Sequence, residues 1–129
     1  MKIISWNVRG LERMDKRKEV RKLVGEKNTF IVCQRETKVP VCDDFLCSAV
    51  WGNTPFGFSY RPSAGVSGGL LSIWDPTEVK VWSSLSQDYV MWCHSQFIRT
   101  DEEFLVANVY APCDSGAKQG LWNSLAVRL

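Results

Sequence analysis

Two stretches decide the fold of this chain: KIISWNVRG at residues 2–10 and FIVCQRETK at residues 30–38. In each, an apolar run predicts a buried strand and polar residues follow at once, with Asn7 after the first run and Glu36 after the second. If both runs are parallel strands of one sheet, these side chains lie together at its carboxyl edge, where open α/β sheets hold ligands. An amide beside a carboxylate there would form half of a site for magnesium and phosphate.

A helix is expected between the two strands. Asp15 is its predicted N-cap, and the helix continues to about Lys27. Val20, Leu23 and Val24 recur at helical spacing and form its buried stripe. Strand, helix and strand within about thirty residues form a βαβ unit, whose crossover is right-handed and whose strands are parallel.

The rest of the chain is dominated by predicted strands. Residues 39–55 carry no assigned element, because Val39-Pro40 breaks the chain and residues 51–55 have turn composition. Further elements are strands at 56–60, 70–74, 79–85, 89–99 and 104–110, a hairpin turn at 100–103, a loop at 111–116, and a final helix with Leu121, Trp122, Leu125 and Leu129. Short turns between the later strands indicate antiparallel pairing, so the sheet is expected to be mixed and the fold class to be α/β (α+β).

Length and composition describe an ordinary globular domain. The 129 residues suffice for one domain, with 45% apolar and 23% charged residues. No apolar stretch is long enough to span a membrane, and the short N-terminal run does not predict a signal peptide. Five cysteines without paired spacing predict reduced thiols in an intracellular protein, nuclear or cytoplasmic, rather than a disulfide framework or a zinc site.

Positive charge is concentrated near the N-terminus. Residues 1–38 contain eleven Lys/Arg and five Asp/Glu, a net charge of +6, whereas residues 39–129 contain five and nine, a net charge of −4. The basic segment at 13–22 consists of Arg13, Lys16, Arg17, Lys18, Arg21 and Lys22. It could hold a phosphate backbone electrostatically, or it could be only the solvated face of a surface helix.

Four short motifs resemble those of a known family. Residues 5–11, Ser-Trp-Asn-Val-Arg-Gly-Leu, resemble the first motif of the endonuclease/exonuclease/phosphatase superfamily, in the form found in plant non-LTR (LINE-type) retrotransposon endonucleases. Residues 31–38 are similar to its second motif, which usually ends in Gln-Glu-Thr-Lys, residues 65–74 to its Ser-Gly-Gly strand, and residues 108–112 to its Asn-Val-Tyr-Gly-Pro motif. The resemblance runs over all 129 residues and covers roughly the N-terminal half of the family domain.

The resemblance implies a partial four-layer α/β sandwich of the deoxyribonuclease-like type, with a mixed sheet and flanking helices, and a magnesium-dependent phosphodiesterase that acts on DNA. Carried over by position, Glu36 would be the metal ligand, with Asn7 beside it. Asn7 would also orient the phosphate, Tyr110 would donate its hydroxyl to a phosphate oxygen, and Asn108 would support the site. Nucleic acid would be bound by Arg9, Arg13, Lys16, Arg17, Lys18, Arg21 and Lys22.

Two departures from the family pattern bear on activity. Arg35 stands where the family has Gln, with Gln34 one place earlier; this cation would weaken metal binding or be neutral, whereas turned toward DNA it could help. The Asp-Asn and Ser-Asp-His motifs that position and activate the attacking water are not in the sequence. His94, the single histidine, matches no family position and is expected to be structural or on the surface.

The expected function is that of a single truncated endonuclease-like domain, residues 1–129, without turnover as an isolated chain. One alternative is a non-catalytic remnant with weak, salt-sensitive nucleic-acid binding through the basic segment. Another is a sugar or lipid phosphatase, against which only the resemblance of the first motif argues. Truncation is also expected to remove the partner sheet and to leave an apolar face with Trp74, Trp82 and Trp92 uncovered, which would favour self-association.

Simpler structural roles stay open for the same residues. Asn7 could cap the turn that follows it, and Glu36 could be a solvated carboxylate paired with a neighbouring cation. Tyr110 could be a core aromatic residue. The glycines of Ser67-Gly68-Gly69 are expected to form the tight start of a strand rather than a phosphate cradle.

Overall fold

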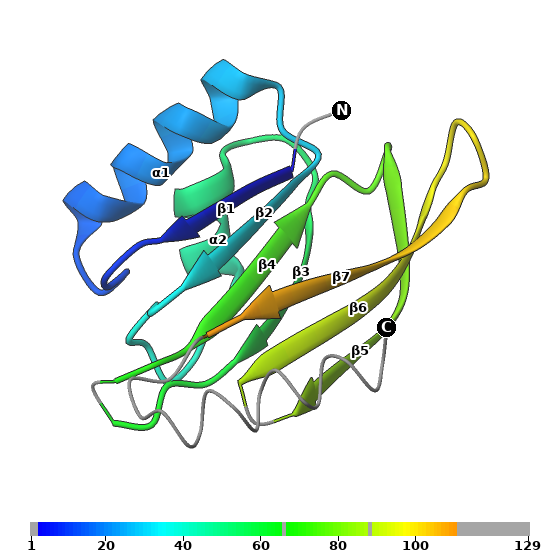
Figure 1. Ribbon diagram of the computed structural model, residues 1–129. Coiled ribbons are helices and arrows are strands. Elements are labelled where there is room, and N and C mark those ends of the chain that lie inside the picture. Colours follow the sequence, from blue (N-terminus) through cyan, green and yellow to red (C-terminus); the bar gives the residue numbers. More distant parts are fainter. Residues whose placement is uncertain (1–2, 66, 88, 111–129) are drawn as a thin grey trace.

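Two sheets and two helices form the part of the chain that the structure, a computed structural model, describes: residues 3–65, 67–87 and 89–110 (Figure 1). The elements are, in order, β1 (Ile3–Asn7), α1 (Met14–Lys27), β2 (Ile31–Arg35), α2 (Asp44–Trp51), β3 (Gly57–Arg61), β4 (Leu70–Trp74), β5 (Val79–Gln87), β6 (Val90–Phe97) and β7 (Glu103–Val109). The predicted loop at 111–116 and the predicted final helix lie outside the described residues. Within those residues, no helix has the length and apolar character needed to cross a membrane.

The first sheet is mixed, as the sequence predicts. Its strand order is β1-β2-β4-β3, with β1 and β2 parallel and β4 antiparallel to both of its neighbours. The crossover through α1 makes β1, α1 and β2 the predicted βαβ unit. The register pairs Asn7 with Arg35, so both parallel strands end level with each other. The second sheet, β5-β6-β7, is antiparallel throughout.

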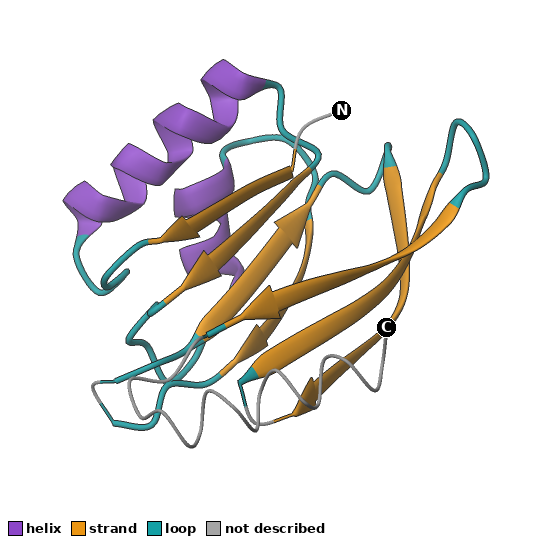
Figure 2. Cartoon of the chain, viewed as in Figure 1, coloured by secondary structure: helices purple, strands orange, loops and turns teal. Residues whose placement is uncertain are grey.

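Both helices pack on the same face of the first sheet (Figure 2). In α1, Val20 and Val24 are buried and Leu23 is half-buried, which confirms the predicted apolar stripe. The face that the helices cover is formed by apolar residues of the central strands, Val32, Leu71 and Ile73. Burial of this kind, rather than helix propensity, stabilises short helices in proteins.

The predicted N-cap of α1 is wrong. The helix begins at Met14, Arg13 is the N-cap residue without a side-chain hydrogen bond, and Asp15 lies in the first turn. Arg17 Nε donates to the Leu11 carbonyl at 2.6 Å, a contact that ties this turn to the preceding loop. The helix start is therefore held by a local side-chain to backbone contact instead of a side-chain cap, and the Asp15 carboxylate lies at the positive end of the helix dipole.

Residues 39–55, which carry no predicted element, contain α2. Asp43 is its N-cap, and Asp43 Oδ1 accepts from the Leu46 N–H at 2.9 Å. The helix buries a stripe against the core that consists of Leu46, Cys47, Val50 and Trp51. The Asp43-Asp44 pair is thus a helix start signal, a cap followed by an acidic first residue, and not loop composition.

The other face of the first sheet packs against the second sheet. Ile31 and Cys33 of β2 belong to one buried cluster with Val79 of β5. Phe97 and Phe104 pack against this cluster and stack on each other, with ring centroids 4.1 Å apart. The expectation that truncation removes the partner sheet is therefore wrong, because β5, β6 and β7 supply that sheet within the described residues.

The three tryptophans expected on an uncovered face have different environments. Trp74 is half-buried between the two sheets, and Trp92 is 7% exposed. Trp82 is 41% exposed, and its ring lies edge-on to the exposed ring of His94 with centroids 4.6 Å apart. The exposed apolar surface is therefore on the outer side of the second sheet, and His94 is a surface residue, as expected.

Candidate functional site

The carboxyl ends of β1, β2 and β7 lie near one another at one edge of the molecule (Figure 1). Beyond the strand ends, the Gly10 N–H donates to the Glu36 carbonyl at 2.7 Å, and the Leu11 N–H donates to the Thr37 carbonyl at 2.8 Å. These bonds continue the pairing of β1 and β2 into the loops that follow. The two polar strand ends are thus held side by side, as the sequence predicts.

The start of β4 closes the same edge. The Thr37 N–H donates to the Gly69 carbonyl at 3.2 Å, and the Lys38 N–H donates to the Gly68 carbonyl at 2.9 Å. Gly69 has a φ of +96°, and a Cβ there would collide with Thr37 Oγ1, so only glycine fits. The Ser67-Gly68-Gly69 segment therefore forms the tight start of a strand, as expected, and fixes the loop that carries Glu36.

Asn7 and Glu36 bring side-chain oxygens to this edge. Asn7 pairs in register with Arg35, the residue before Glu36. Asn7 Oδ1 is buried and accepts no hydrogen bond from the described residues, so it does not cap the turn that follows. Glu36 is half-buried and forms no ion pair within the described part of the chain; its φ of +55° is uncommon for a residue with a side chain. A buried acceptor without a partner, near a carboxylate, fits a hard cation such as Mg²⁺.

Asn108 joins the second sheet to this edge. Its side chain is buried, with 2% of its surface exposed. Its Nδ2 donates at 3.1–3.3 Å to three acceptors on the first sheet, which are the Gln34 carbonyl, the Leu71 carbonyl and Ser72 Oγ. Because Asn108 is enclosed in this way, it is placed to hold β7 against β2 and β4 and not to touch a substrate.

Tyr110 follows directly after β7. Its N–H donates to the Tyr89 carbonyl at 2.8 Å, and the two rings lie 6.3 Å apart with a tilt of 36°. The Tyr110 side chain is half-buried. The Tyr110 ring therefore lies beside the Tyr89 ring, directly after the end of β7.

Arg35, directly before Glu36, is held by a contact that was not predicted from the sequence. Its Nη1 donates to Ser5 Oγ at 2.6 Å. Ser5 lies two residues before Asn7 and therefore on the same face of β1, farther from the carboxyl edge. The contact directs the guanidinium back along the sheet, away from the loop that carries Glu36. The signal available in the sequence was the alternation of Ser5 and Asn7 along one strand.

The first half of the basic segment is engaged within the protein. Arg13 Nη2 lies 2.7 Å from Asp15 Oδ2, and Lys16 Nζ lies 3.2 Å from Glu19 Oε2. Lys16 Nζ also lies 5.9 Å from the centroid of the Trp6 ring. A hollow of about 190 Å³ at the start of α1 is lined by basic and acidic side chains together. Its lining residues are Arg9, Gly10, Glu12, Arg13, Asp15, Lys16 and Glu19. The acidic residues reduce the positive potential next to the candidate site.

The second half of the basic segment is free of such pairing. Lys18, Arg21 and Lys22 are exposed along α1, and none of them forms an ion pair with another described residue. As α1 begins at the carboxyl edge and runs away from it, these cations lie one to two turns from the edge.

The described histidine and cysteine side chains do not add metal ligands to the carboxyl edge. No group of three or more His, Cys, Asp and Glu residues that could hold a metal occurs in residues 3–65, 67–87 and 89–110. Four cysteines, Cys33, Cys42, Cys47 and Cys93, are free and buried. Burial raises the pKa of the Cys42 and Cys47 thiols to about 12, so these groups are protonated and poor metal ligands near neutral pH.

Comparisons with known proteins identify the fold. No protein-family model matches the sequence, and no curated protein matches it. Among solved structures, the chain is similar to AP endonuclease LMAP from Leishmania major, with a TM-score of 0.64, 15% identity, and coverage of 93% of this chain and 43% of that one. The APE2 catalytic domain from Xenopus laevis has a TM-score of 0.63 and 18% identity, with coverage of 95% of this chain and 49% of that one. Humanized TDP2 from D. rerio has a TM-score of 0.66 and 14% identity, with coverage of 98% of this chain and 54% of that one.

These likenesses confirm the predicted fold class. The chain has a deoxyribonuclease I-like fold, with two helices and two sheets in the described residues. It spans about half the length of the structures that it resembles, between 43% and 54% of these three.

Proposed function

We propose that this chain is the N-terminal portion of a magnesium-dependent nucleic-acid phosphodiesterase domain, of the kind carried by plant LINE-type retrotransposons. In this proposal residues 1–129 are a single truncated domain that binds Mg²⁺ weakly and a phosphodiester at the carboxyl edge, and that does not turn over by itself. DNA is the proposed ligand, because the first motif resembles that of DNA endonucleases and the solved structures with this fold include an AP endonuclease.

One observation supports the proposal above the others. The ends of β1, β2 and β7 come from three separate parts of the sequence and converge at one edge, where Asn108 Nδ2 donates to the Gln34 carbonyl two residues before Glu36. Asn7, Glu36 and Tyr110 thus lie at one edge and not on separate surfaces. The buried Asn7 Oδ1 has no hydrogen-bond donor among the described residues, as is also true of Thr37 Oγ1 and Asn108 Oδ1 near the same edge, so this edge holds buried oxygens that a bound ion or water could satisfy.

Each residue at the edge has a distinct proposed role. Glu36 and Asn7 would hold Mg²⁺, which when bound would supply charge stabilisation to a phosphate oxygen. Asn7 would also orient the phosphate, and the Tyr110 hydroxyl would donate to one of its oxygens. Asn108 is a positioning residue, because its buried amide holds β7 against the first sheet.

The missing activity has a chemical reason. Hydrolysis of a phosphodiester needs a group that positions and deprotonates water, and such groups contribute typically 10²–10⁴-fold. The Asp-Asn and Ser-Asp-His motifs are not in these 129 residues, and the single histidine, His94, lies on the outer face of the second sheet. Binding and charge stabilisation without that group leave much of the barrier in place.

The test is a magnesium titration of the intact chain followed by amide NMR. We expect saturable shifts at the amides of residues 35–38, which Glu36→Gln abolishes and Glu26→Gln, an exposed glutamate at the far end of α1, leaves intact. Nicking of supercoiled plasmid in magnesium should not exceed a buffer blank. Shifts that survive Glu36→Gln would remove the metal assignment, and nicking that Glu36→Gln abolishes would show that the chain is catalytically complete.

A second function is favoured by the free cations on α1. Lys18, Arg21 and Lys22 are exposed and unpaired within the described residues, as expected of a surface that binds a phosphate backbone. In this alternative the chain is a non-catalytic remnant that binds nucleic acid weakly and in a salt-sensitive way. It differs from the first proposal in needing neither Glu36 nor Mg²⁺.

A further inference from the structure

Three strands of the first sheet run in the same direction and end in one row. Because β4 is antiparallel to both β2 and β3, and β1 is parallel to β2, the strands β1, β2 and β3 all end at the carboxyl edge. Their last residues are Asn7, Arg35 and Arg61. The register aligns these three residues through Leu70, the first residue of β4, in a single row across the sheet. Arg61 thus has the position on β3 that Asn7 has on β1.

The residues of this row also share one face of the sheet. Register partners on neighbouring strands project to the same side, and side chains alternate along each strand. Trp6 and Tyr60, which precede Asn7 and Arg61, both pack on the cluster under the helices. Asn7 and Arg61 therefore project from the opposite face. A ligand that lies along the carboxyl edge can meet both residues from the same side.

The Arg61 guanidinium has no partner within the described residues. Its Nη1 is buried without a hydrogen-bond acceptor, and Arg61 forms no ion pair with another described residue. Arg35, in the same row, differs because its Nη1 donates to Ser5 Oγ. A buried cationic N–H without an acceptor is costly, whereas the planar fork of a guanidinium matches two oxygens of a phosphate. Since the Arg61 side chain as a whole is only half-buried, it also reaches the surface, and an anion is the ligand that fits it.

Backbone contacts fix the end of β3 relative to the candidate metal site. The Ser63 N–H, two residues after Arg61, donates at 3.1 Å to the carbonyl of Val39, which lies three residues after Glu36. Along the row, the strand order places Asn7 and Arg61 three strand spacings apart, or roughly 14 Å. Each strand of a nucleic-acid duplex advances about 3.4 Å along the axis per nucleotide, so this separation corresponds to about four nucleotides.

We propose that Arg61 binds a backbone phosphate a few nucleotides away from the phosphodiester that Asn7 and Glu36 hold, on the same nucleic acid. This inference rests on the proposed function of the carboxyl edge and adds the size of the substrate. A polynucleotide spans the row from Asn7 to Arg61. A mononucleotide, a sugar phosphate or a lipid headgroup is too short to reach both ends at once.

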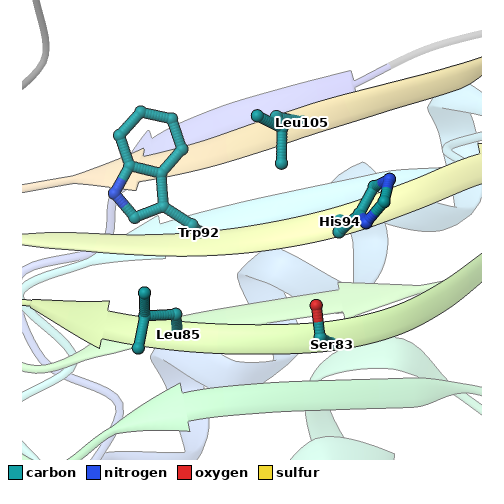
Figure 3. Close-up of a pocket in the computed structure, with 5 residues that line it drawn as sticks. All are labelled: Ser83, Leu85, Trp92, His94 and Leu105. Carbon is teal, nitrogen blue, oxygen red and sulfur yellow. The ribbon is translucent and has the colours of Figure 1, made fainter. Parts of the chain in front are cut away.

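The hollow on the outer face of the second sheet is not a competing site for the anion (Figure 3). It is lined by Ser83, Leu85, Trp92, His94 and Leu105, and it has neither a lysine nor an arginine in its lining. Arg99 supplies a matched control instead. Its side chain is 76% exposed and lies 2.8 Å from Glu78, in the turn between β6 and β7 and therefore at the opposite end of the strands from the carboxyl edge.

The test measures how affinity depends on the length of the ligand. Labelled oligonucleotides from roughly two to roughly twelve nucleotides are titrated by fluorescence anisotropy with the parent chain, Arg61→Gln and Arg99→Gln. We expect Arg61→Gln to weaken binding of the longest oligonucleotide by about tenfold, because a charge-assisted hydrogen bond to phosphate is lost, and to leave the shortest unaffected. Arg99→Gln should have little effect at any length. An equal loss at every length, or no loss at all, would overturn the proposal.

Two further variants or ligands exclude simpler explanations. Arg61→Lys keeps the charge and should recover part of the affinity for the longest oligonucleotide, and urea denaturation checks that Arg61→Gln is folded. If Arg61→Gln unfolds, Arg61→Lys carries the test, because the loss of the fork should still weaken only the long ligands. Inorganic phosphate covers the other source of the anion. Binding of phosphate alone that is as tight as that of the longest oligonucleotide, and that Arg61→Gln weakens, would show a free-anion site and overturn the proposal.

The magnesium titration separates this inference from the proposed function. Arg61→Gln should retain the magnesium-dependent shifts at the amides of residues 35–38. If those shifts occur but affinity does not depend on Arg61 and ligand length, the role of Arg61 fails and the metal assignment stands. If affinity depends on Arg61 and length without any shifts, only the metal assignment fails. A parent chain that binds no oligonucleotide would overturn both.

Discussion

The Arg35 guanidinium donates to Ser5 Oγ at 2.6 Å and is thereby held on the face of β1 that also carries Asn7, behind it relative to the carboxyl edge. The residue before Glu36 is therefore a cation drawn back from the candidate metal site. Its effect on the site depends on a single hydroxyl group.

Removing that hydroxyl should release the cation toward the edge. We expect Ser5→Ala to weaken Mg²⁺ binding by up to roughly 30-fold, because a divalent and a univalent cation about 4 Å apart in a solvated setting repel by about 2 kcal/mol. Arg35→Gln alone should change affinity little, and the double variant should restore it. Magnesium titrations of the four proteins form a double-mutant cycle, and an additive outcome would disprove the role of Ser5.

Asn108 should contribute strongly to stability. The two Nδ2 hydrogens are shared among three buried acceptors on the first sheet, so Asn108→Ala removes these bonds and leaves two carbonyls without this donor. We expect a loss of about 2 to 4 kcal/mol in the free energy of unfolding, measured by urea denaturation. Ala107→Ser, at the exposed neighbouring position, is the control and should have little effect. A loss below about 1 kcal/mol for Asn108→Ala would mean that water replaces the amide.

Gln34 should be a destabilising residue. Its side chain is fully buried, and neither of its amide atoms has a hydrogen-bond partner among the described residues. Its register neighbours Trp6 and Leu71 both belong to the cluster under the helices, so the amide faces an apolar core. Gln34→Leu should stabilise the fold by about 1 to 3 kcal/mol in urea denaturation. The control variant Gln96→Leu removes a hydrogen bond to the Asp101 carbonyl and should not stabilise the fold. A loss of stability in Gln34→Leu would mean that the Gln34 amide has a partner outside the described residues.

Alkaline pH should destabilise the protein through its thiols. Burial raises the pKa of Cys33 to about 11 and of Cys42 and Cys47 to about 12, above the ordinary value of 9.0. Above pH 9 the unfolded chain loses these protons while the folded chain keeps them, so the stabilisation is complete below pH 9 and is lost as the pH rises toward 11–12. The urea midpoint should fall between about pH 9 and pH 11. Cys47→Ala should flatten this fall, and an unchanged slope would show that the Cys47 thiol does not contribute.

The exposed cations of α1 should set the salt dependence of nucleic-acid binding. Neutralising Lys18, Arg21 and Lys22 to Gln should lower the slope of log affinity against log salt by up to about 2.7, or about 0.9 for each duplex phosphate that the protein no longer neutralises. Lys80→Gln is the matched control, since Lys80 lies on β5 over the Trp82 ring. Fluorescence anisotropy of a labelled duplex at several salt concentrations measures the slope. The remnant hypothesis fails if the triple variant retains the slope of the parent.

Local pattern was sufficient for the first half of the fold. The apolar runs before Asn7 and Glu36, and the Val20–Leu23–Val24 stripe between them, predicted β1, α1 and β2 with their parallel pairing. These predictions held because strand and helix periodicities are short-range and a buried crossover has one favoured hand. The position of the candidate site at the carboxyl edge followed from the same unit.

The remainder was decided by contacts between residues distant in the sequence. The helix α2 was not predicted, because its polar start has the composition of a loop. The sequence does not distinguish an Asp that caps a helix from an Asp in a loop, whereas the structure shows that Asp43 accepts from the Leu46 N–H. The direction of Arg35 depends on Ser5, thirty residues earlier, and the attachment of β7 depends on the Asn108–Gln34 bond across seventy-four residues. A single sequence determines which faces are apolar, but only the packed chain determines which of them meet, since hydrogen bonds and burial select among pairings that the local pattern leaves equal.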